Sequence, residues 1–278
     1  MELGLRDRVA IVTGASRGFG RATAGVLARE GCRLGVCARS EERLREAAAE
    51  LEAEGVEALA RVCDVFDAEQ ARDFVEAVAE RFGGVDILVN NVGGLHDPVR
   101  ALFADTTDEV WLRTFEMNVV QSVRLTRLCL PHMRARGGGA VVNIGSISGV
   151  RPSGFDAHYC TAKAAMIMQS RSLAQELGRL GIRINTVSPG SAWWPGNVWD
   201  VIREAYPEDY GDMVRSTPFG RLTAPEDVAD VVAFLVSDRA RWVHGANIQV
   251  DGGQEGAGIE PGLLADLRRK RAGRHKEA

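Results

Sequence analysis

The sequence predicts an α/β protein built on an open, doubly wound parallel sheet with helices on both faces. Short apolar segments rich in β-branched residues alternate with longer segments of helical periodicity from the start of the chain. Such alternation is typical of βαβ units, because two parallel strands need a crossover connection that is usually a helix. No change in composition interrupts residues 1–253. We therefore expect a single domain there, followed by a basic tail over residues 254–278.

The predicted strands are short runs of apolar and β-branched residues, as expected for strands buried on both sides of a parallel sheet. They cover Val9–Thr13, Leu34–Ala38, Ala58–Cys63, Ile87–Asn90, Ala140–Ile144, Arg183–Val187 and Ile248–Val250. The segments between them have helical spacing, and the break at Gly137–Gly139 ends the longest of these helices. The predicted helices cover about Phe19–Glu30, Glu41–Glu54, Glu69–Phe82, Asp108–Arg136, Tyr159–Leu180 and Pro225–Val236.

Composition and charge narrow the class of protein. With 278 residues and 45% hydrophobic content, the chain can bury a large core. The net charge of −4 gives no basic balance of the kind that nucleic-acid binding needs. The chain has no charged-then-apolar leader and no apolar stretch of about 18 residues, so we expect a cytoplasmic protein that does not bind membranes. Five cysteines without Cys-x-x-Cys spacing and five scattered histidines predict neither disulfides nor a metal site.

A glycine-rich turn between the first predicted strand and the first predicted helix is the candidate cofactor site. Thr13–Gly20 has the spacing T-G-x-x-x-G-x-G, a variant of the dinucleotide fingerprint. Glycines allow a tight turn and a close approach of a pyrophosphate, and the helix that follows offers free N–H groups and a positive dipole end. A purely structural turn is the alternative. The candidate contacts are Gly14, Ser16, Arg17, Gly18, Phe19 and Gly20.

The end of the second predicted strand indicates which dinucleotide binds. An NAD site usually places a carboxylate there for the ribose hydroxyls, whereas this chain has Arg39 and no acid before Glu41. Arg39 and Arg17 can bracket a 2′-phosphate, for which a guanidinium group is well shaped. We therefore predict that the cofactor is NADP(H) rather than NAD(H). Two ordinary surface arginines are the alternative interpretation.

Two further strand ends are expected to face the cofactor. Asp64 and Val65 follow the third predicted strand and can hold the adenine edge. Asn91 and Gly93 follow the fourth and can face the ribose and the nicotinamide. Both segments lie at the carboxyl ends of strands, where open α/β sheets bind their ligands.

Tyr159, Lys163 and Ser146 form a candidate proton-transfer device. Tyr159 and Lys163 are four residues apart, so on a helix their side chains share one face. A free phenol has a pKa of about 10 and is a poor acid or base at neutral pH. A neighbouring ammonium favours the phenolate, so we expect Lys163 to lower the pKa of Tyr159. Ser146 can then orient an oxygen of the substrate.

Taken together, the motifs resemble those of the short-chain dehydrogenase/reductase family over about residues 5–253, with the 3-oxoacyl-acyl-carrier-protein reductases nearest in style. The motifs that carry the resemblance are Thr13–Gly20, Asp64, Asn90–Gly93, Asn118, Ser146, Tyr159 with Lys163, and Ser188–Gly190. The resemblance implies a Rossmann-like fold with a parallel sheet of about seven strands. It also implies assembly into a homo-oligomer, either a dimer or a tetramer.

The resemblance further implies a role for each residue of the site. Tyr159 is expected to act as the general acid/base, and Ser146 to position the carbonyl. Lys163 is expected to hold the nicotinamide ribose as well as to perturb the tyrosine. Asn118 is expected to anchor a water of the proton relay. The cofactor contacts are completed by Tyr159, Lys163, Pro189 and Gly190.

The chain departs from the family's pattern at two positions. Val92 replaces the alanine of the usual Asn-Asn-Ala-Gly. Trp194 stands where many members have a threonine that contacts the nicotinamide carboxamide. It lies in residues 191–217, the region of the family's substrate lid, together with Trp193 and Trp199. These tryptophans indicate either an apolar or aromatic pocket wall or the packing of the lid on itself or on a neighbouring subunit.

The sequence therefore predicts an NADP(H)-dependent oxidoreductase that interconverts a ketone and a secondary alcohol by hydride transfer, with a small apolar or aromatic substrate. The alternative is an alcohol dehydrogenase that oxidises a secondary, steroid, sugar or aromatic alcohol, with NAD as a further option. A nucleotide-sensing protein without catalysis is a more remote alternative, because it predicts a broken catalytic set and all four residues are present.

Overall fold

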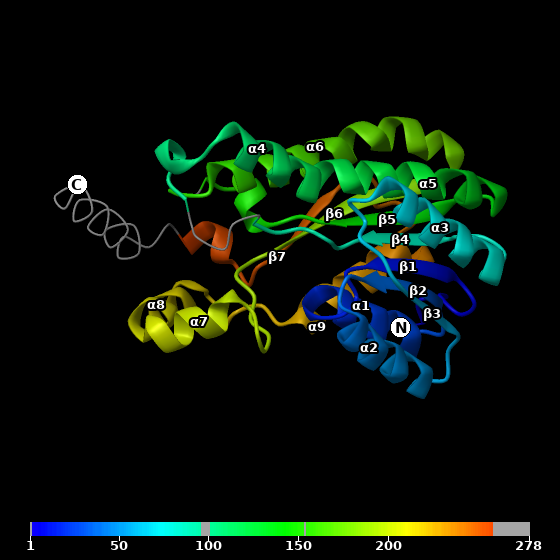
Figure 1. Ribbon diagram of the computed structural model, residues 1–278, viewed down its shortest axis with the longest axis horizontal. Coiled ribbons are helices and arrows are strands. Elements are labelled where there is room, and N and C mark those ends of the chain that lie inside the picture. The colour runs from blue at the N-terminus through cyan, green and yellow to red at the C-terminus, as the bar shows by residue number, and fades with distance from the viewer. Residues whose placement is uncertain (1, 96–100, 153, 258–278) are drawn as a thin grey trace.

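The structure is a computed structural model and describes residues 2–95, 101–152 and 154–257. These residues contain a seven-stranded parallel sheet in the order β3-β2-β1-β4-β5-β6-β7, with helices on both faces (Figure 1). The strands are β1 (Val9–Thr13), β2 (Arg33–Ala38), β3 (Ala58–Val62), β4 (Ile87–Asn90), β5 (Gly139–Ile144), β6 (Ile182–Pro189) and β7 (Asn247–Val250). The predicted fold class is confirmed, and every predicted strand is present: β1 and β4 have the predicted bounds, and the other five differ by one or two residues at one or both ends.

Two layers of helices cover the sheet. They are α1 (Gly18–Arg29), α2 (Glu41–Ala53) and α9 (Pro225–Val236) on one face, and α3 (Ala68–Phe82), α5 (Gln121–Ala135) and α6 (Ala157–Leu177) on the other (Figure 1). The pleat divides the apolar side chains of each strand between two cores. Along β1, Ala10 and Val12 belong to the core under α1, whereas Val9 and Ile11 belong to the core under α3. Burial on both sides explains why the strands are continuous apolar runs.

The order of the strands places a crevice at the carboxyl ends of β1 and β4. From β1 the chain first moves outward to β2 and β3, and it then returns to β4 on the other side of β1. Open α/β sheets bind ligands at such a reversal, because the two crossover connections leave in opposite directions. The register pairs Thr13 with Cys37 and Asn90 with Asn143, so the segments after β1, β2, β4 and β5 leave from one edge.

The helix predicted over about residues 108–136 is interrupted. It consists of α4 (Asp108–Phe115), a π-helical turn at Glu116–Val120, and α5. The predicted helical stretch is therefore present, but the π-helical turn within it was not predicted, because apolar periodicity on both sides of the turn conceals the extra residue. Turns of this kind often occur at functional sites, and this one contains Asn118.

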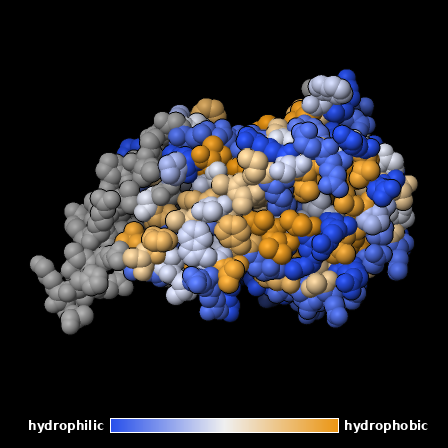
Figure 2. Space-filling view, turned by 90° about the horizontal axis from the view of Figure 1, so that it is seen from above, coloured by the Kyte–Doolittle hydropathy of each residue, from blue (hydrophilic) through white to orange (hydrophobic). Residues whose placement is uncertain are grey.

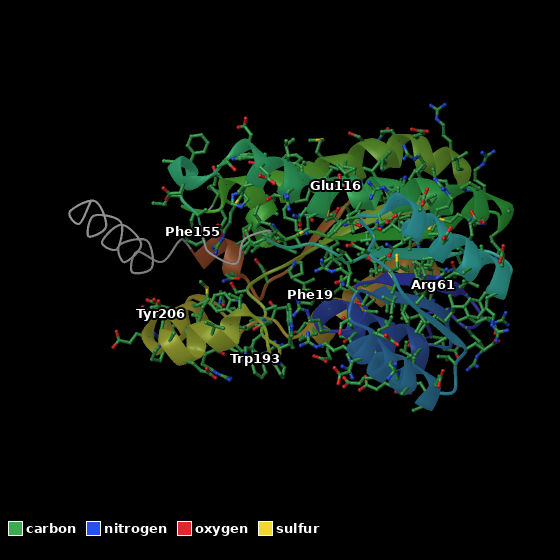
Figure 3. All side chains as sticks on the ribbon, viewed as in Figure 1. Phe19, Arg61, Glu116, Phe155, Trp193 and Tyr206 are labelled. Atoms are coloured by element: carbon green, nitrogen blue, oxygen red, sulfur yellow. The ribbon has the colours of Figure 1, made fainter. Side chains whose placement is uncertain are left out.

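The predicted lid, residues 191–217, contains two short helices beside the carboxyl edge of the sheet (Figures 1 and 3). These are α7 (Val198–Ala205) and α8 (Pro207–Ser216). The side chain of Asn197 starts α7 by accepting from the N–H of Trp199 (3.0 Å). Pro207 suits the first position of α8, where a backbone N–H has no helical partner.

The outer side of α4, α5 and α6 carries apolar side chains on its surface. Figure 2 views the molecule from this side and shows apolar residues interspersed among polar ones. Exposed members include Leu112 on α4, Val123 on α5 and Met168 on α6. Within the described part of the chain, no helix combines the length and apolar character that crossing a membrane requires. Residues 258–278, most of the predicted basic tail, lie outside the described residues.

Candidate active site

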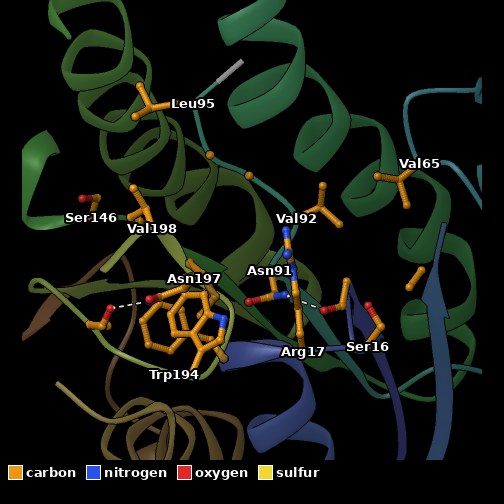
Figure 4. A pocket seen from close by; sticks show the side chains of 18 of the residues that line it. Ser16, Arg17, Val65, Asn91, Val92, Leu95, Ser146, Trp194, Asn197 and Val198 are labelled. Atoms are coloured by element: carbon orange, nitrogen blue, oxygen red, sulfur yellow. Dashed lines mark hydrogen bonds between the residues drawn. The ribbon is translucent and has the colours of Figure 1, made fainter. Parts of the chain in front are cut away.

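A cleft of about 630 Å³ opens at the carboxyl edge of the sheet (Figure 4). Segments after β1 to β6 and part of the lid line it. Most of the predicted site residues are brought together here: Gly14, Ser16, Arg17, Phe19, Arg39, Asp64, Val65, Asn91, Gly93, Ser146, Tyr159, Lys163 and Gly190. The predicted residues that do not line the cleft are Gly18, Gly20, Asn118 and Pro189.

The turn after β1 is tight, and glycine is required at several of its positions. Gly14 and Gly18 have φ angles of +66° and +54°, which other residues rarely adopt. A Cβ on Gly20 would lie 2.4 Å from the carbonyl oxygen of Gly14, so only glycine allows α1 to start so close to the strand. Asn91 holds the turn from the side of β4, because its Nδ2 donates to the carbonyl oxygens of Thr13 (2.8 Å) and Gly14 (3.2 Å) (Figure 4).

The N-terminus of α1 has the properties of an anion site. No side chain caps this helix, so the N–H groups of its first turn have no side-chain partner. Ser16 and Arg17, which directly precede this helix, and Phe19 in its first turn all line the cleft. Free N–H groups at the positive end of a helix dipole suit a phosphate group. The turn therefore fits the pyrophosphate of the dinucleotide that the sequence predicts.

Three arginines line the cleft between the turn after β1 and the first turn of α2: Arg17, Arg39 and Arg43. All three are exposed, and none of their guanidinium groups has a hydrogen-bond or ion-pair partner in the described part of the chain. Arg45 differs, since it pairs with Glu41 (2.8 Å). Arg43 was not predicted as a site residue. Its signal was its place four residues after Arg39, in the first turn of the helix predicted from Glu41.

The three residues predicted to transfer a proton, Tyr159, Ser146 and Lys163, all line the cleft. The hydroxyl of Tyr159 is hydrogen-bonded to that of Ser146, which follows β5. Nζ of Lys163 lies 5.8 Å from the centroid of the Tyr159 ring. The same Nζ donates to the carbonyl oxygen of Ile144 (2.8 Å). Spacing of four residues on α6 thus places both side chains on one face, as predicted from the sequence.

Burial is the largest influence on the pKa values of Tyr159 and Lys163, and it was not predicted from the sequence. It raises the pKa of Tyr159 to about 12, and the hydrogen bond with Ser146 lowers that pKa only in part. Burial also lowers the pKa of Lys163 to about 7. The expectation that Lys163 brings the pKa of the tyrosine below its ordinary value is therefore wrong in this structure. Desolvation disfavours the charged form of both groups, so the phenol is protonated at neutral pH.

The π-helical turn directs Asn118 to the segment that follows β4. Asn118 is fully buried, and its Nδ2 donates to the carbonyl oxygens of Gly94 (2.9 Å) and Thr114 (2.8 Å). Its Oδ1 accepts from the N–H of Gly94 (3.0 Å). A Cβ on Gly93 would lie 2.8 Å from this Oδ1 and 3.0 Å from Nζ of Lys163. Asn118 therefore holds the backbone next to Lys163 from behind the cleft wall.

The lid tryptophans have different surroundings. Trp194 and Trp199 line the cleft, and Trp193 does not. Nε1 of Trp193 donates to Asp200 (2.8 Å), and its ring lies 5.3 Å from the guanidinium carbon of Arg203, so it packs within the lid (Figure 3). Trp194 and Trp199 thus fit the interpretation as a pocket wall, whereas Trp193 fits the interpretation as packing of the lid on itself.

Gln254 joins the lid to the C-terminal segment and was not predicted as a site residue. It is 1% exposed, and its Oε1 accepts from the N–H of Ser191 (2.7 Å). Its carbonyl oxygen accepts from the guanidinium of Arg151 (2.7 Å). A Cβ on Gly190 would lie 2.7 Å from the same Oε1, which explains the glycine there. A glutamine in a glycine-rich segment gives no sequence signal for such a contact.

In the part of the chain that the structure describes, no group of three or more His, Cys, Asp or Glu side chains is arranged to hold a metal ion. The five cysteines are free.

Comparison with known proteins agrees with this geometry. The family model described as "Enoyl-(Acyl carrier protein) reductase" matches residues 14–255. A putative ketoacyl reductase of Streptomyces coelicolor is 38% identical over an alignment of 258 residues, and the match covers 89% of this chain and 97% of that protein.

Two solved structures extend the likeness to ligand-bound proteins. L-sorbose reductase from Gluconobacter frateurii, in complex with NADPH and L-sorbose, is 37% identical and has a TM-score of 0.85, covering 91% of this chain and 98% of that one. A 7α-hydroxysteroid dehydrogenase, in complex with NADH and 7-oxo glycochenodeoxycholic acid, is 31% identical and has a TM-score of 0.84, covering 91% and 96%. With these relatives, the chain belongs to the short-chain dehydrogenase/reductase family of oxidoreductases.

Proposed function

We propose that this protein is an NADP(H)-dependent oxidoreductase that interconverts a ketone and a secondary alcohol. The observation that carries the proposal is the meeting of Tyr159, Ser146 and Lys163 in the same cleft as the uncapped N-terminus of α1. A proton donor and an anion-binding turn in one cleft support a reaction between a phosphate-bearing cofactor and a small substrate. The nicotinamide, when bound, would supply or accept the hydride.

Tyr159 is proposed as the general acid in reduction. Because burial raises the pKa of its phenol to about 12, the hydroxyl is protonated at neutral pH and has a proton for the developing alkoxide. The adjacent hydroxyl of Ser146 is proposed to orient the carbonyl oxygen and to stabilise the charge that develops on it. In oxidation the same phenol oxygen receives the proton of the alcohol.

Lys163 and Asn118 are proposed as supporting residues. An ammonium has three donors, and Lys163 uses one of them on the carbonyl oxygen of Ile144. The others remain available for the hydroxyls of the nicotinamide ribose. Oδ1 of Asn118 accepts from Gly94 and retains a second lone pair, which can hold a water of the proton relay.

The preference for NADP(H) over NAD(H) rests on charge. Arg17, Arg39 and Arg43 have guanidinium groups without a partner in the described part of the chain, and Asp64 is the one acid among the described residues that line the cleft. A 2′-phosphate suits such a cluster, whereas an unmodified ribose is usually bound by a carboxylate at the end of the second strand. Both cofactor types occur among the solved relatives, so the arginines carry this proposal.

Arg39→Ala is expected to weaken the binding of NADPH and to leave the binding of NADH nearly unchanged. The loss should be roughly 1–3 kcal/mol at low salt, as for a hydrogen bond to a charged group, and smaller at high salt because Arg39 is exposed. Calorimetric titration with both cofactors measures it. Arg45→Ala is the matched control, because Arg45 is an exposed arginine on the α2 helix that follows Arg39, but it pairs with Glu41 and does not line the cleft. Equal losses for NADPH and NADH would contradict the assignment.

The substrate is proposed to be an apolar or aromatic carbonyl compound. Leu95 and Val198 lie on the side of the cleft near Ser146 (Figure 4), and Trp199 also lines it. Apolar walls with a few polar groups are typical of small-molecule sites. The names of the relatives point to ketoacyl, sugar and steroid substrates, so each class belongs in the test.

Absorbance of NADPH at about 340 nm, followed over a panel of ketones, tests the proposed function. The panel contains β-ketoesters, acyl thioesters, aryl ketones, keto sugars and steroid ketones, and the corresponding alcohols are tested with NADP⁺ and with NAD⁺. Reduction of at least one ketone class is expected. Activity confined to the oxidation of one alcohol class would favour the alternative, an alcohol dehydrogenase.

A homo-oligomer, either a dimer or a tetramer, is proposed from the outer side of α4, α5 and α6. Leu112 is 72% exposed and Met168 58% exposed there, on helices that pack side by side. Exposed apolar side chains on one surface are typical of subunit contacts. Light scattering should give a multiple of the protomer mass, and Leu112→Asp together with Met168→Glu should lower it. A wild-type protein that is monomeric at micromolar concentration would contradict the assembly.

A cytoplasmic location is also proposed. It is supported by five free cysteines, because a reducing compartment keeps thiols unpaired. Cell fractionation measures it, and recovery of the protein outside the cytoplasm would contradict it.

A further inference from the structure

The indole of Trp194 lies on the first turn of α1. Its ring packs edge to face against Phe19, with 5.1 Å between the ring centroids and 64° between the ring planes. A Cβ on Gly18 would lie 2.8 Å from Cε2 of the indole and 2.9 Å from Cζ2. Gly18 does not line the cleft, and its missing side chain makes room for Trp194. Gly18, which was predicted as a cofactor contact, therefore also leaves the space that the indole of the lid residue Trp194 occupies.

The indole N–H of Trp194 has no hydrogen-bond partner in the described part of the chain. Its Nε1 is shielded from solvent and donates a hydrogen bond to no acceptor among the described residues. A buried donor without an acceptor is destabilising, and folded proteins rarely retain one. Trp193, the preceding residue, shows that the lid can satisfy an indole, because its Nε1 donates to Asp200 (2.8 Å). The unmatched N–H is thus specific to the position of Trp194.

The free N–H lies beside other free donors. Nε1 is covalently bonded to Cε2, the indole atom nearest to the Cβ position of Gly18, so the N–H is next to the first turn of α1. The backbone N–H groups of that turn have no side-chain cap and lie at the positive end of the helix dipole. Donors from the helix and from the lid therefore lie close to one another. An acceptor with several oxygens and negative charge matches them best.

Resting on the proposed function, we propose that Trp194 donates its indole hydrogen bond to a phosphate oxygen of the NADP(H) pyrophosphate. This contact makes the lid a part of the cofactor site. Since Nε1 is shielded in the structure, the indole shifts when the ligand arrives, and cofactor binding changes the position of the lid. Trp194 is then a positioning residue for the lid as well as a cofactor contact.

The other acceptor to consider is the nicotinamide carboxamide. The family resemblance implies a carboxamide contact from the position of Trp194 in the chain, so that group is the alternative. The side chain, however, extends to Gly18 and Phe19 at the start of α1. The geometry points to the phosphate, and ligands that contain only one of the two acceptors separate the possibilities.

Trp194→Phe removes the N–H and keeps an aromatic ring against Phe19. Calorimetry compares three ligands: NADP⁺, 2′-phospho-ADP-ribose, which has the pyrophosphate but no nicotinamide, and 2′-AMP, which has neither. We expect the variant to bind the first two about ten- to hundredfold more weakly, as for a lost hydrogen bond to a charged acceptor. Binding of 2′-AMP should be unchanged. The matched control, Trp193→Phe, should alter all three dissociation constants by less than about threefold, because that N–H already has a partner.

Two results would overturn the proposal. One is equal affinity of wild type and Trp194→Phe for 2′-phospho-ADP-ribose. The other is a loss confined to NADP⁺, which would assign the N–H to the carboxamide. Unchanged binding of 2′-AMP and a melting temperature no lower than that of wild type distinguish a lost contact from a misfolded lid, because loss of the unmatched buried N–H does not itself destabilise the protein. A wild-type protein that binds none of the three ligands would instead contradict the proposed function.

Tryptophan fluorescence provides a second readout on the wild-type protein. NADPH absorbs where tryptophan emits, so bound NADPH should be excited by energy transfer from the indole nearest to it. Trp194→Phe should reduce this transfer at saturating NADPH, and Trp193→Phe should reduce it less. Equal transfer in wild type and Trp194→Phe would contradict a position of Trp194 at the cofactor.

Discussion

Tyr159→Phe is expected to lower kcat for ketone reduction by about 10²–10⁴-fold, the range for loss of a positioned general acid. The phenol is the proposed proton donor, and its raised pKa of about 12 keeps it protonated at neutral pH. Phenylalanine preserves the ring beside Lys163 and removes only the hydroxyl that bonds to Ser146. The dissociation constant of NADPH should change little. Steady-state kinetics and calorimetry measure the two quantities.

Tyr206→Phe is the matched control for this substitution. Tyr206 lies between α7 and α8, is exposed and does not line the cleft, so its hydroxyl should not affect kcat. A decrease of less than about tenfold in Tyr159→Phe would assign the proton to another group. A large loss of NADPH affinity in the same variant would show that the tyrosine acts mainly in binding.

Lys163→Met is expected to stabilise the protein while it abolishes most of the activity. Lys163 is 3% exposed, and burial lowers its pKa to about 7. In the unfolded chain its pKa is about 10.4, so the unfolded chain binds the proton more tightly than the folded one. Lys163 therefore lowers the free energy of unfolding, and this destabilisation is fully present below about pH 7. It decreases as the pH rises from about 7 toward about 10.4, because the unfolded chain then also loses the proton. Methionine fills a similar volume without the charge.

The gain in unfolding free energy should be about 2 kcal/mol at pH 7, because the pKa shift outweighs the lost hydrogen bond to Ile144. It should shrink steadily between pH 7 and pH 10. Urea denaturation at several pH values measures it, with activity assayed in parallel and expected to fall about a hundredfold or more. A variant that is less stable than wild type at neutral pH would contradict the desolvation of Lys163.

Much of the fold could be predicted because the strands are buried on both faces. Burial on both sides makes Val9–Thr13 and Ile87–Asn90 continuous apolar runs, which stand out in any sequence. The glycines at 14 and 20 and the spacing of Tyr159 and Lys163 reflect local geometry, which residue spacing records directly. The meeting of these motifs in one cleft follows from parallel strands that end at the same edge.

The parts that could not be predicted depend on contacts distant in sequence. The pKa of Tyr159 depends on its burial, and no count of neighbouring charges reveals how much water reaches a phenol. Trp194 lies against Gly18, a residue far from it in the chain, because the lid folds back over α1. The π-helical turn at Asn118 is selected by hydrogen bonds to Gly94 that exist only in the folded protein.

Transfer of deuterium from the reactive carbon of labelled NADPH to a ketone tests the central claim most directly. Each face of the nicotinamide is labelled in turn, and mass spectrometry follows the product alcohol. We predict that one of the two labelled cofactors gives an alcohol with a single deuterium on its carbinol carbon, and that Tyr159→Phe forms this product at least about a hundredfold more slowly. NADPH that binds in the cleft but transfers deuterium to no member of the ketone panel would contradict the account.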